Sequence, residues 1–541
     1  MPDVTRADSI ALINGIIYPM AYPGRAQALF ARAGIIESVG SNADILKMCD
    51  TKTIVLDMKG AFILPGFTDT HISVLLSGIA AQMLDLSRVS SINRIISAAR
   101  KFFAVHSPAD NGWLYAVGWN EEKLEEKRYP NRYDLDKIST DMPMLFERSC
   151  GTVVSLNSKA IEVLGITRDL EIHGGTMFLD DNGEPNGVMG GAAVHWTKMR
   201  IPKVNEDTLE RCFSLAAQQL IKRGVTSVQT DDVAVVGDPD RVFSLYENLD
   251  AKDKVPLRLT EQWPFQNIKE LSEFVRHGSH LRHSRYFRSG PLKIQVDGSL
   301  GAYTAALRED YNDDPGNRGV YLHTQEELNE MTALAQEAGM LVAFCAVGDG
   351  AIERSLNAVE YAANKTHSHV RHRIIHCQVM PDDLCARMVT LGVMADIQPV
   401  FISSDWSIIM SRLGAERARS SYAWKTMIAS GIPVGAGSNA PIAPSDPFTG
   451  IVTSMTRRDK RGKPEHGWIP SQRLDRVEAF AVYTSGGSNV CGELAWRGTL
   501  EKGKAADFIA CMQDPFTVHE EEIDKIEIGL TVVDGKIRYI K

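Results

Sequence analysis

Five side chains that can bind a metal ion or move a proton stand at or near the ends of short apolar runs: His71, Lys293, Cys345, His376 and Asn439. Imidazole nitrogens and cysteine thiolates are zinc ligands. A cysteine beside a histidine can instead act as a nucleophile, and a lysine removed from water can act as a base. The sequence therefore indicates metal chemistry, proton transfer or covalent catalysis, provided that the fold gathers these positions.

The elements that carry these residues alternate regularly along the middle of the chain. Eight apolar, β-rich runs cover residues 62–71, 225–230, 256–262, 292–297, 341–347, 372–378, 392–399 and 432–439. Helical spacing follows at about 206–223, and Thr324 with Glu327 forms a capping box at the start of another helix. This alternation predicts an α/β protein with a (β/α)₈ TIM barrel, whose site lies at the C-terminal strand ends. A doubly wound sheet is the alternative.

The two ends of the chain read as short strands separated by Gly and Asp. Each end is too small to bury a core alone, so residues 1–64 and 490–541 are expected to pair into one β-sandwich. Residues 65–489 would form the barrel domain. The interval between the first two barrel strands is too long for one crossover. We therefore expect an insertion at 85–205 that caps the barrel.

Composition narrows the class of protein. The 541 residues are 44% hydrophobic and 23% charged, as in ordinary globular chains, with a net charge of −9. The sequence has no basic cluster of the kind that would indicate nucleic-acid binding. It also has no apolar stretch long enough for a membrane helix. The first residues do not resemble a secretory signal, so a cytoplasmic protein with free cysteines is expected. The expected partner is a small-molecule substrate, and a homo-oligomer is left open.

Several short motifs occur in an order typical of one protein group. They are Gly118-Trp119-Asn120, Asn157-Ser158-Lys159-Ala160, Asp297-Gly298-Ser299-Leu300-Gly301, Gly348-Asp349, residues 371–378 and Gly503-Lys504-Ala505-Ala506-Asp507. On these motifs the chain resembles the amidohydrolase superfamily, in its N-substituted formamide deformylase-like branch. The resemblance spans nearly the whole chain and implies a barrel with a two-segment β-sandwich.

The resemblance also implies one or two divalent metal ions. Active members hold them with His-x-His after the first strand, a lysine (often carboxylated) or acidic residue on the fourth, histidines on the fifth and sixth, and an aspartate after the eighth. The aspartate also accepts a proton from water. His71, Lys293 and His376 match this pattern.

Other positions depart from the pattern of the family. Ser73 replaces the second histidine of His-x-His, Cys345 the histidine of strand five, Asn439 the aspartate, and Thr152 a histidine of the insertion. A hydroxyl is a weak ligand beside an imidazole, and an amide does not accept a proton at neutral pH. The usual two-metal mechanism is therefore not expected to survive intact.

Three interpretations of the altered site remain open. In the first, His71, Cys345 and His376 hold one zinc ion, and Asp297 or Asp349 is the base. In the second, a metal-independent lyase, hydratase or isomerase uses the lysine, the thiol and the imidazoles. In the third, the chain is a catalytically inactive relative that binds a small molecule.

We predict an amidohydrolase-like enzyme acting on a carbon–nitrogen bond, other than a peptide bond, of a small organic substrate. The catalytic candidates are Lys293, Cys345, His376, Asn439 and Asp297, although Asp297 also suits a turn. Trp119, Ser73, Thr152 and Ser438 are candidates for substrate binding. His372 lies four residues before His376 and is expected away from the site.

Overall fold

The computed structural model describes residues 8–105, 112–148, 153–172, 175–202, 204–265 and 267–541. The chain divides into two units. The barrel unit comprises Met1–Val74 and Ala216–Lys541, and the insert unit comprises Leu75–Leu215.

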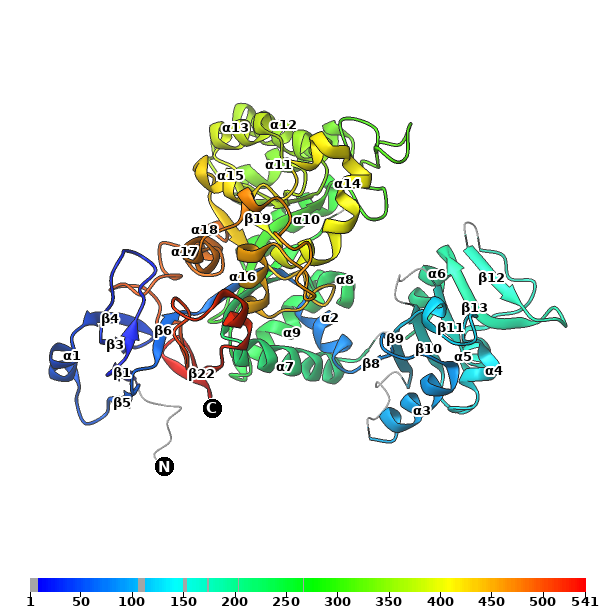
Figure 1. The fold of residues 1–541 in the computed structure, drawn as a ribbon, viewed down its shortest axis with the longest axis horizontal. Helices are drawn as coiled ribbons and strands as arrows, with labels where there is room; N and C mark the ends of the chain where they lie inside the picture. Colours follow the sequence, from blue (N-terminus) through cyan, green and yellow to red (C-terminus); the bar gives the residue numbers. More distant parts are fainter. Residues whose placement is uncertain (1–7, 106–111, 149–152, 173–174, 203, 266) are drawn as a thin grey trace. The chain divides into compact units, whose positions relative to one another are not determined.

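A parallel sheet of eight strands forms the centre of the barrel unit (Figure 1). In chain order its strands are β7 (Phe67–Ile72), β14 (Val225–Thr230), β15 (Arg258–Trp263), β16 (Phe287–Gln295), β17 (Val342–Ala346), β18 (Arg373–His376), β19 (Met394–Ile397) and β20 (Val434–Ala436). Each strand pairs with the next in the sequence. All eight predicted runs therefore overlap a strand of this sheet.

Hydrogen bonds close the gap between the last and the first strand. The backbone N–H of Asn439, just after β20, donates to the His71 carbonyl at 2.7 Å, and the Ser73 N–H donates to the Ala440 carbonyl at 2.9 Å. The sheet is thus a nearly closed barrel, which confirms the predicted fold class and excludes the doubly wound alternative.

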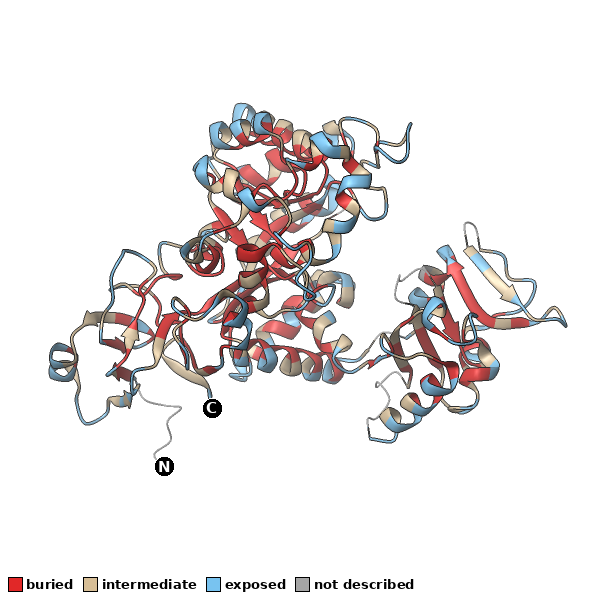
Figure 2. Cartoon of the chain, viewed as in Figure 1, coloured by how far each residue is buried: buried red, intermediate tan, exposed pale blue. Residues whose placement is uncertain are grey.

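Helices connect and cover the barrel strands. They are α7 (Glu206–Lys222), α8 (Val233–Val236), α9 (Pro239–Ala251), α10 (Ile268–Arg276), α11 (Gln325–Glu337), α12 (Asp349–Lys365), α13 (Asp382–Leu391), α14 (Ile402–Ala418), α15 (Trp424–Ala429), α16 (Pro447–Thr456), α17 (Arg476–Ala481) and α18 (Ser485–Val490). Thr324 and Glu327 form the predicted capping box before α11. Figure 2 shows the strands buried and the outer helix faces exposed, as apolar strand runs and amphipathic helices require.

Strands from both chain ends form two further sheets in the barrel unit. One has the order β4 (Ile35–Gly40), β3 (Ala28–Arg32), β1 (Ser9–Ile13), β5 (Ile54–Asp57). The other has the order β2 (Ile16–Ile17), β6 (Phe62–Pro65), β21 (Phe508–Cys511), β22 (Ile528–Val533), β23 (Lys536–Ile540). The antiparallel pairing of β6 with β21 joins the two ends. Buried residues of both sheets, including Leu12, Ile63, Phe508 and Val532, share one core.

The insert unit has its own sheet and core. The sheet has the order β12 (Gly175–Leu179), β13 (Pro185–Gly191), β11 (Val153–Leu156), β10 (Met144–Arg148), β9 (Leu114–Trp119), β8 (Leu84–Asp85). Its helices are α3 (Ile92–Phe103), α4 (Arg132–Leu135), α5 (Ser158–Leu164) and α6 (Ala192–Arg200), and α2 (Val74–Ala80) leads into it. The unit extends beyond the predicted insertion at 85–205 on both sides. Its role as a cap stays a prediction.

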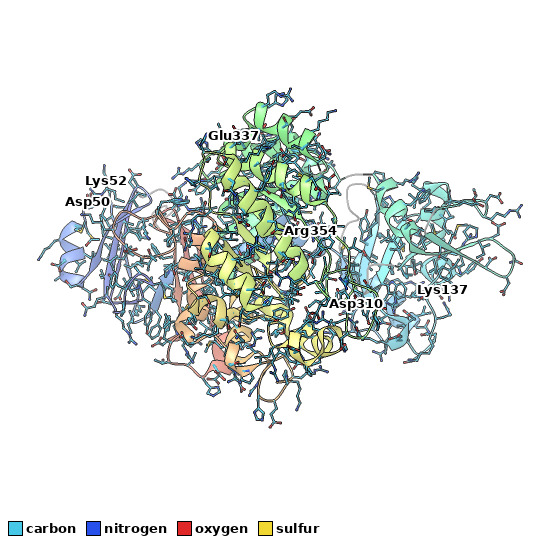
Figure 3. All side chains as sticks on the ribbon, turned by 90° about the horizontal axis from the view of Figure 1, so that it is seen from above. Asp50, Lys52, Lys137, Asp310, Glu337 and Arg354 are labelled. Atoms are coloured by element: carbon cyan, nitrogen blue, oxygen red, sulfur yellow. The ribbon has the colours of Figure 1, made fainter. Side chains whose placement is uncertain are left out.

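Helix α1 (Asn42–Met48) and five short 3₁₀ helices complete the described elements. The 3₁₀ helices are η1 (Glu121–Lys123), η2 (Ser279–Leu281), η3 (Pro399–Phe401), η4 (Pro470–Gln472) and η5 (Glu520–Lys525). Charged side chains of the outer surface, such as Asp50, Lys52 and Glu337, are exposed (Figure 3). In the part of the chain that the structure describes, no helix combines the length and apolarity needed to cross a membrane.

Candidate active site

Three metal-binding side chains converge at the C-terminal end of the barrel. His71 stands near the end of β7, Cys345 near the end of β17, and His376 at the end of β18. One donor atom from each lies within 4.8 Å of the other two. The two imidazole rings are perpendicular, with centroids 5.7 Å apart. These are the three residues that the sequence predicts as zinc ligands.

The electrostatic state of the histidines suits a ligand role. Burial, and then the nearby charge of Lys293, lowers the pKa of His71 well below its ordinary value and that of His376 to about 4. Both imidazoles are therefore neutral at pH 7, with a nitrogen lone pair available. The buried Nδ1 atoms of both rings have no hydrogen-bond partner among the described residues. Unpaired buried nitrogens are costly and call for a ligand.

Cys345 supplies a sulfur donor in the same place. Its side chain is buried, and burial raises the pKa of its thiol to about 11, although Lys293 opposes this shift. A metal cation beside the sulfur would favour the thiolate. Two neutral imidazoles and one cysteine are a donor set that zinc accepts, with a fourth position left open. The residues present therefore fit a divalent metal ion.

The backbone is strained where two barrel strands end. His376 and Cys377 have φ angles of +80° and +47°, and Asn439 has a φ angle of +55°. Such left-handed conformations in residues other than glycine cost about 1–3 kcal/mol and concentrate at functional sites. The turns after β18 and β20 are thus held in shape by their surroundings.

The loop after β20 holds β7 in place through hydrogen bonds. Asp69 of β7 accepts hydrogen bonds from the backbone N–H of Ser438 at 2.9 Å and of His71 at 3.2 Å. The Ser438 hydroxyl accepts from the N–H of Ala440 at 3.0 Å, and the Asn439 N–H is bound to the His71 carbonyl. Ser438 therefore stabilises the turn, and its role in substrate binding stays a prediction.

Two further predicted site residues form hydrogen bonds with other groups of the protein. The Ser73 hydroxyl donates to the Asp232 carboxylate at 2.7 Å. Asp297 is fully buried and accepts from the backbone N–H groups of Ala306, Val347 and Gly348 at 2.9, 3.0 and 2.8 Å. A carboxylate engaged by three amides anchors loops. This arrangement argues against Asp297 as the general base.

The predicted residues of the insertion are not part of this cluster as described. Trp119 belongs to the core of the insert unit, is fully buried, and donates from Nε1 to the Phe146 carbonyl at 2.9 Å. It therefore has no exposed surface for a substrate. Thr152 lies outside the described residues.

Sequence reasoning missed two acidic residues beside Lys293. The Lys293 ammonium group, on β16, forms an ion pair with the carboxylate of Asp231, directly after β14. Glu261 on β15 accepts from the backbone N–H groups of Asp232 at 2.8 Å and Val233 at 3.2 Å. The available signal was the pair Asp231-Asp232 directly after the second strand.

Comparisons with known proteins agree with this architecture. Residues 55–539 match the Amidohydrolase family. The chain is 32% identical to the amidohydrolase YtcJ of Bacillus subtilis, covering 98% of this chain and 99% of that protein. It is 24% identical to the N-substituted formamide deformylase of Arthrobacter pascens, covering 99% of each chain.

A solved structure shares the fold over nearly the same extent. It is an uncharacterized metal-dependent hydrolase from Pyrococcus furiosus, 27% identical, with a TM-score of 0.80 and coverage of 94% of this chain and 100% of that one. The match of the family over most of the chain, together with the observed barrel, leads to one conclusion: this chain belongs to the amidohydrolase family.

Proposed function

We propose that this protein hydrolyses a carbon–nitrogen bond, other than a peptide bond, in a small organic substrate. The proposal includes one divalent metal ion, zinc, held by His71, Cys345 and His376. The observation that carries it is the convergence of these three donors within 4.8 Å. Family membership and the metal-dependent hydrolase of Pyrococcus furiosus support hydrolysis with a metal.

The ligand set differs from the one that the family resemblance implies, and the difference limits the number of metal ions. Ser73 is bound to Asp232, and Asn439 contributes an amide in place of a carboxylate. The described residues therefore support one cluster of three donors, and we propose a single ion. Such an ion supplies Lewis acidity, because it polarises a carbonyl group and makes nearby water more acidic.

The substrate class follows from the family and from one relative. The relative named N-substituted formamide deformylase matches this chain over its whole length. We propose an N-substituted formamide or a similar amide as the substrate. Among the described residues, two cations, Lys293 and Arg373, act on His71, and the second is fully buried and lies 3.4 Å from the Asp396 carboxylate. This surrounding suits a neutral substrate better than a polyanion.

Metal analysis of the purified protein, combined with aniline release from formanilide, tests this proposal. We expect about one zinc per chain, zinc loss in Cys345→Ala, and activity that disappears with a chelator and returns with zinc. Cys385→Ala is a matched control, because Cys385 is also buried and free but lies on α13.

Two other outcomes would contradict the proposal in different ways. Activity that survives complete metal removal would point to metal-independent proton transfer. A protein that binds formanilide but releases no aniline would point to a binding relative.

A further inference from the structure

A buried ion pair lies near the three donors. Lys293 extends from β16 and Asp231 follows β14, and these strands are separated by β15. Their side chains are 11% and 17% exposed, so both are largely shielded from water without being sealed. Glu261 on β15, by contrast, is completely buried. The ion pair is therefore partly exposed, whereas Glu261 is not.

Glu261 fixes the position of the Asp231–Lys293 ion pair. One of its carboxylate oxygens accepts from the N–H groups of Asp232 and Val233, which fixes the turn that carries Asp231. Burial, and then the charges of Asp232 and Asp231, raises the pKa of Glu261 well above its ordinary value. The carboxylate that pairs with Lys293 is that of Asp231.

Only one of the two carboxylate oxygens of Asp231 is paired within the described residues. Lys293 binds Oδ2, while the buried Oδ1 has no hydrogen-bond partner within the described residues. Two other positions considered for a proton acceptor are less suited, because position 439 is an asparagine and Asp297 is held by three backbone amides. Asp231 is a carboxylate beside Lys293 with one oxygen unpaired within the described residues.

We propose, on the basis of the proposed function, that Asp231 and Lys293 form the proton-transfer pair of the reaction. A water molecule gives a proton to Asp231 Oδ1 while its oxygen bonds to the substrate carbonyl carbon. Lys293 Nζ then gives a proton to the leaving nitrogen, and the carbon–nitrogen bond breaks. The proton on Asp231 passes to the neutral lysine along their hydrogen bond, which restores the ion pair. One water is consumed, and an acid and an amine are released.

This scheme requires Lys293 to be an ammonium group. Although burial disfavours its charge, nearby Cys345 and Asp231 raise its pKa above the ordinary value. The family resemblance allows a carboxylated lysine at this position. A carbamate is negatively charged and would repel Asp231, whereas an ammonium group pairs with it. The scheme therefore requires the unmodified side chain, which the ¹³C experiment below tests.

Two substrates that differ only in leaving group separate the roles of the pair. Formanilide releases aniline, which needs a proton, whereas 4-nitroformanilide releases a much less basic amine. We expect Lys293→Gln to lower kcat by about 10²–10⁴-fold for formanilide and by far less for 4-nitroformanilide. Asp231→Asn should lower kcat for both substrates equally, and Asp231→Glu should recover part of it. Bound zinc should equal that of the wild type in all three variants.

A control and an independent readout accompany these variants. Glu478→Gln is the control, because Glu478 lies on α17, outside the site, and pairs with Lys425. This variant should change neither the rate nor its dependence on the leaving group. In addition, ¹³C NMR of the wild-type protein in ¹³C-bicarbonate should show no lysine carbamate signal.

Each contrary result has a distinct meaning. A carbamate signal at Lys293, or unchanged rates in Asp231→Asn with an active wild type, would overturn this inference alone. Zinc loss in Lys293→Gln or Asp231→Asn would assign the pair to metal binding and overturn it too. A wild type that hydrolyses neither formanilide would overturn the proposed function and, with it, the inference.

Discussion

Two groups of buried polar side chains, one at each end of the barrel, differ in whether they have hydrogen-bond partners. Near the start of β7, the Arg497 guanidinium binds Glu493 Oε2, Thr68 Oγ1 at 2.7 Å and Ser488 Oγ at 2.9 Å. At the other end, buried Nδ1 atoms of His71 and His376 have no partner among the described residues. A buried group without a partner costs about 1–3 kcal/mol. The base of the barrel, at the N-terminal ends of the strands, is thus built for stability. The mouth, at the C-terminal ends, retains binding capacity at some cost in stability.

One strand shows the same contrast within four residues. His372, just before β18, accepts from the Val342 N–H at Nδ1, at 3.0 Å, and its Nε2 lies 2.8 Å from Gln336 Oε1. His376 ends the same strand with an unpaired Nδ1. The first histidine lies away from the donor cluster, as predicted, and is bound on both sides. The second keeps a lone pair for a ligand.

Removing the arginine at the base should have the largest effect on stability. Arg497→Ala leaves Glu493 as a buried charge without its partner, which typically costs about 3–5 kcal/mol. Denaturant unfolding of the metal-free protein measures this loss. Arg461→Ala is the control, because the Arg461 side chain is 82% exposed and should change stability by less than about 0.5 kcal/mol. A small loss in Arg497→Ala would contradict the proposed difference between the two ends.

Acid should weaken the fold through His372. Burial lowers its pKa from 6.5 to about 4 in the folded protein, so the unfolded chain takes up the proton first as pH falls. Its contribution is complete above about pH 6.5 and is lost as pH falls to about 4, a change of roughly 3 kcal/mol. His372→Asn should flatten the fall in unfolding free energy over this range. An unchanged slope would show that other groups cause the acid sensitivity.

A methyl group added at Gly437, next to His71, should displace His71 at the mouth of the barrel. A Cβ at Gly437 would lie 2.5 Å from the His71 backbone nitrogen and 3.0 Å from the His71 Cβ. Gly437→Ala should therefore shift His71, cost about 1–3 kcal/mol and weaken zinc binding in a chelator competition. Gly40→Ala, where a Cβ meets nothing within 4 Å, is the control. Full zinc affinity in Gly437→Ala would mean that His71 is not a ligand.

Replacing a ligand at the mouth should have the smallest effect on stability. His71→Asn removes a buried ring nitrogen that has no partner in the described structure, so no protein hydrogen bond of that atom is lost. We expect a change below about 1 kcal/mol in the metal-free protein, together with loss of zinc. Calorimetry with and without zinc separates the two effects. A large loss without zinc would place His71 among the stabilising groups.

The sequence was most informative where a strand end carries a distinctive side chain. The barrel strands are recognisable as apolar runs, and His71, Cys345 and His376 each stand near the C-terminal end of one. The role of Asp297 could not be decided from the sequence, because an Asp-Gly pair after a strand does not reveal which amides will point at the carboxylate. Its three N–H partners come from two different loops.

The partner of Lys293 could not be read from the sequence for a related reason. Lys293 and Asp231 come from strands separated by another strand, so their contact depends on barrel register and strand tilt. Trp119 shows a second limit, because a tryptophan in a polar motif suits a pocket as well as a core. Only the packing of the insert unit decides between them.

The pairing of β6 with β21 has a consequence for biosynthesis. Strand β6 leaves the ribosome early but needs residues 508–511 as its neighbour, so it must wait for almost the entire chain. At about 5–20 residues per second, tens of seconds pass before that partner emerges. During this interval the open edge of β6 is available to chaperones and to other nascent chains. A truncated translation product would never acquire the strand that protects it.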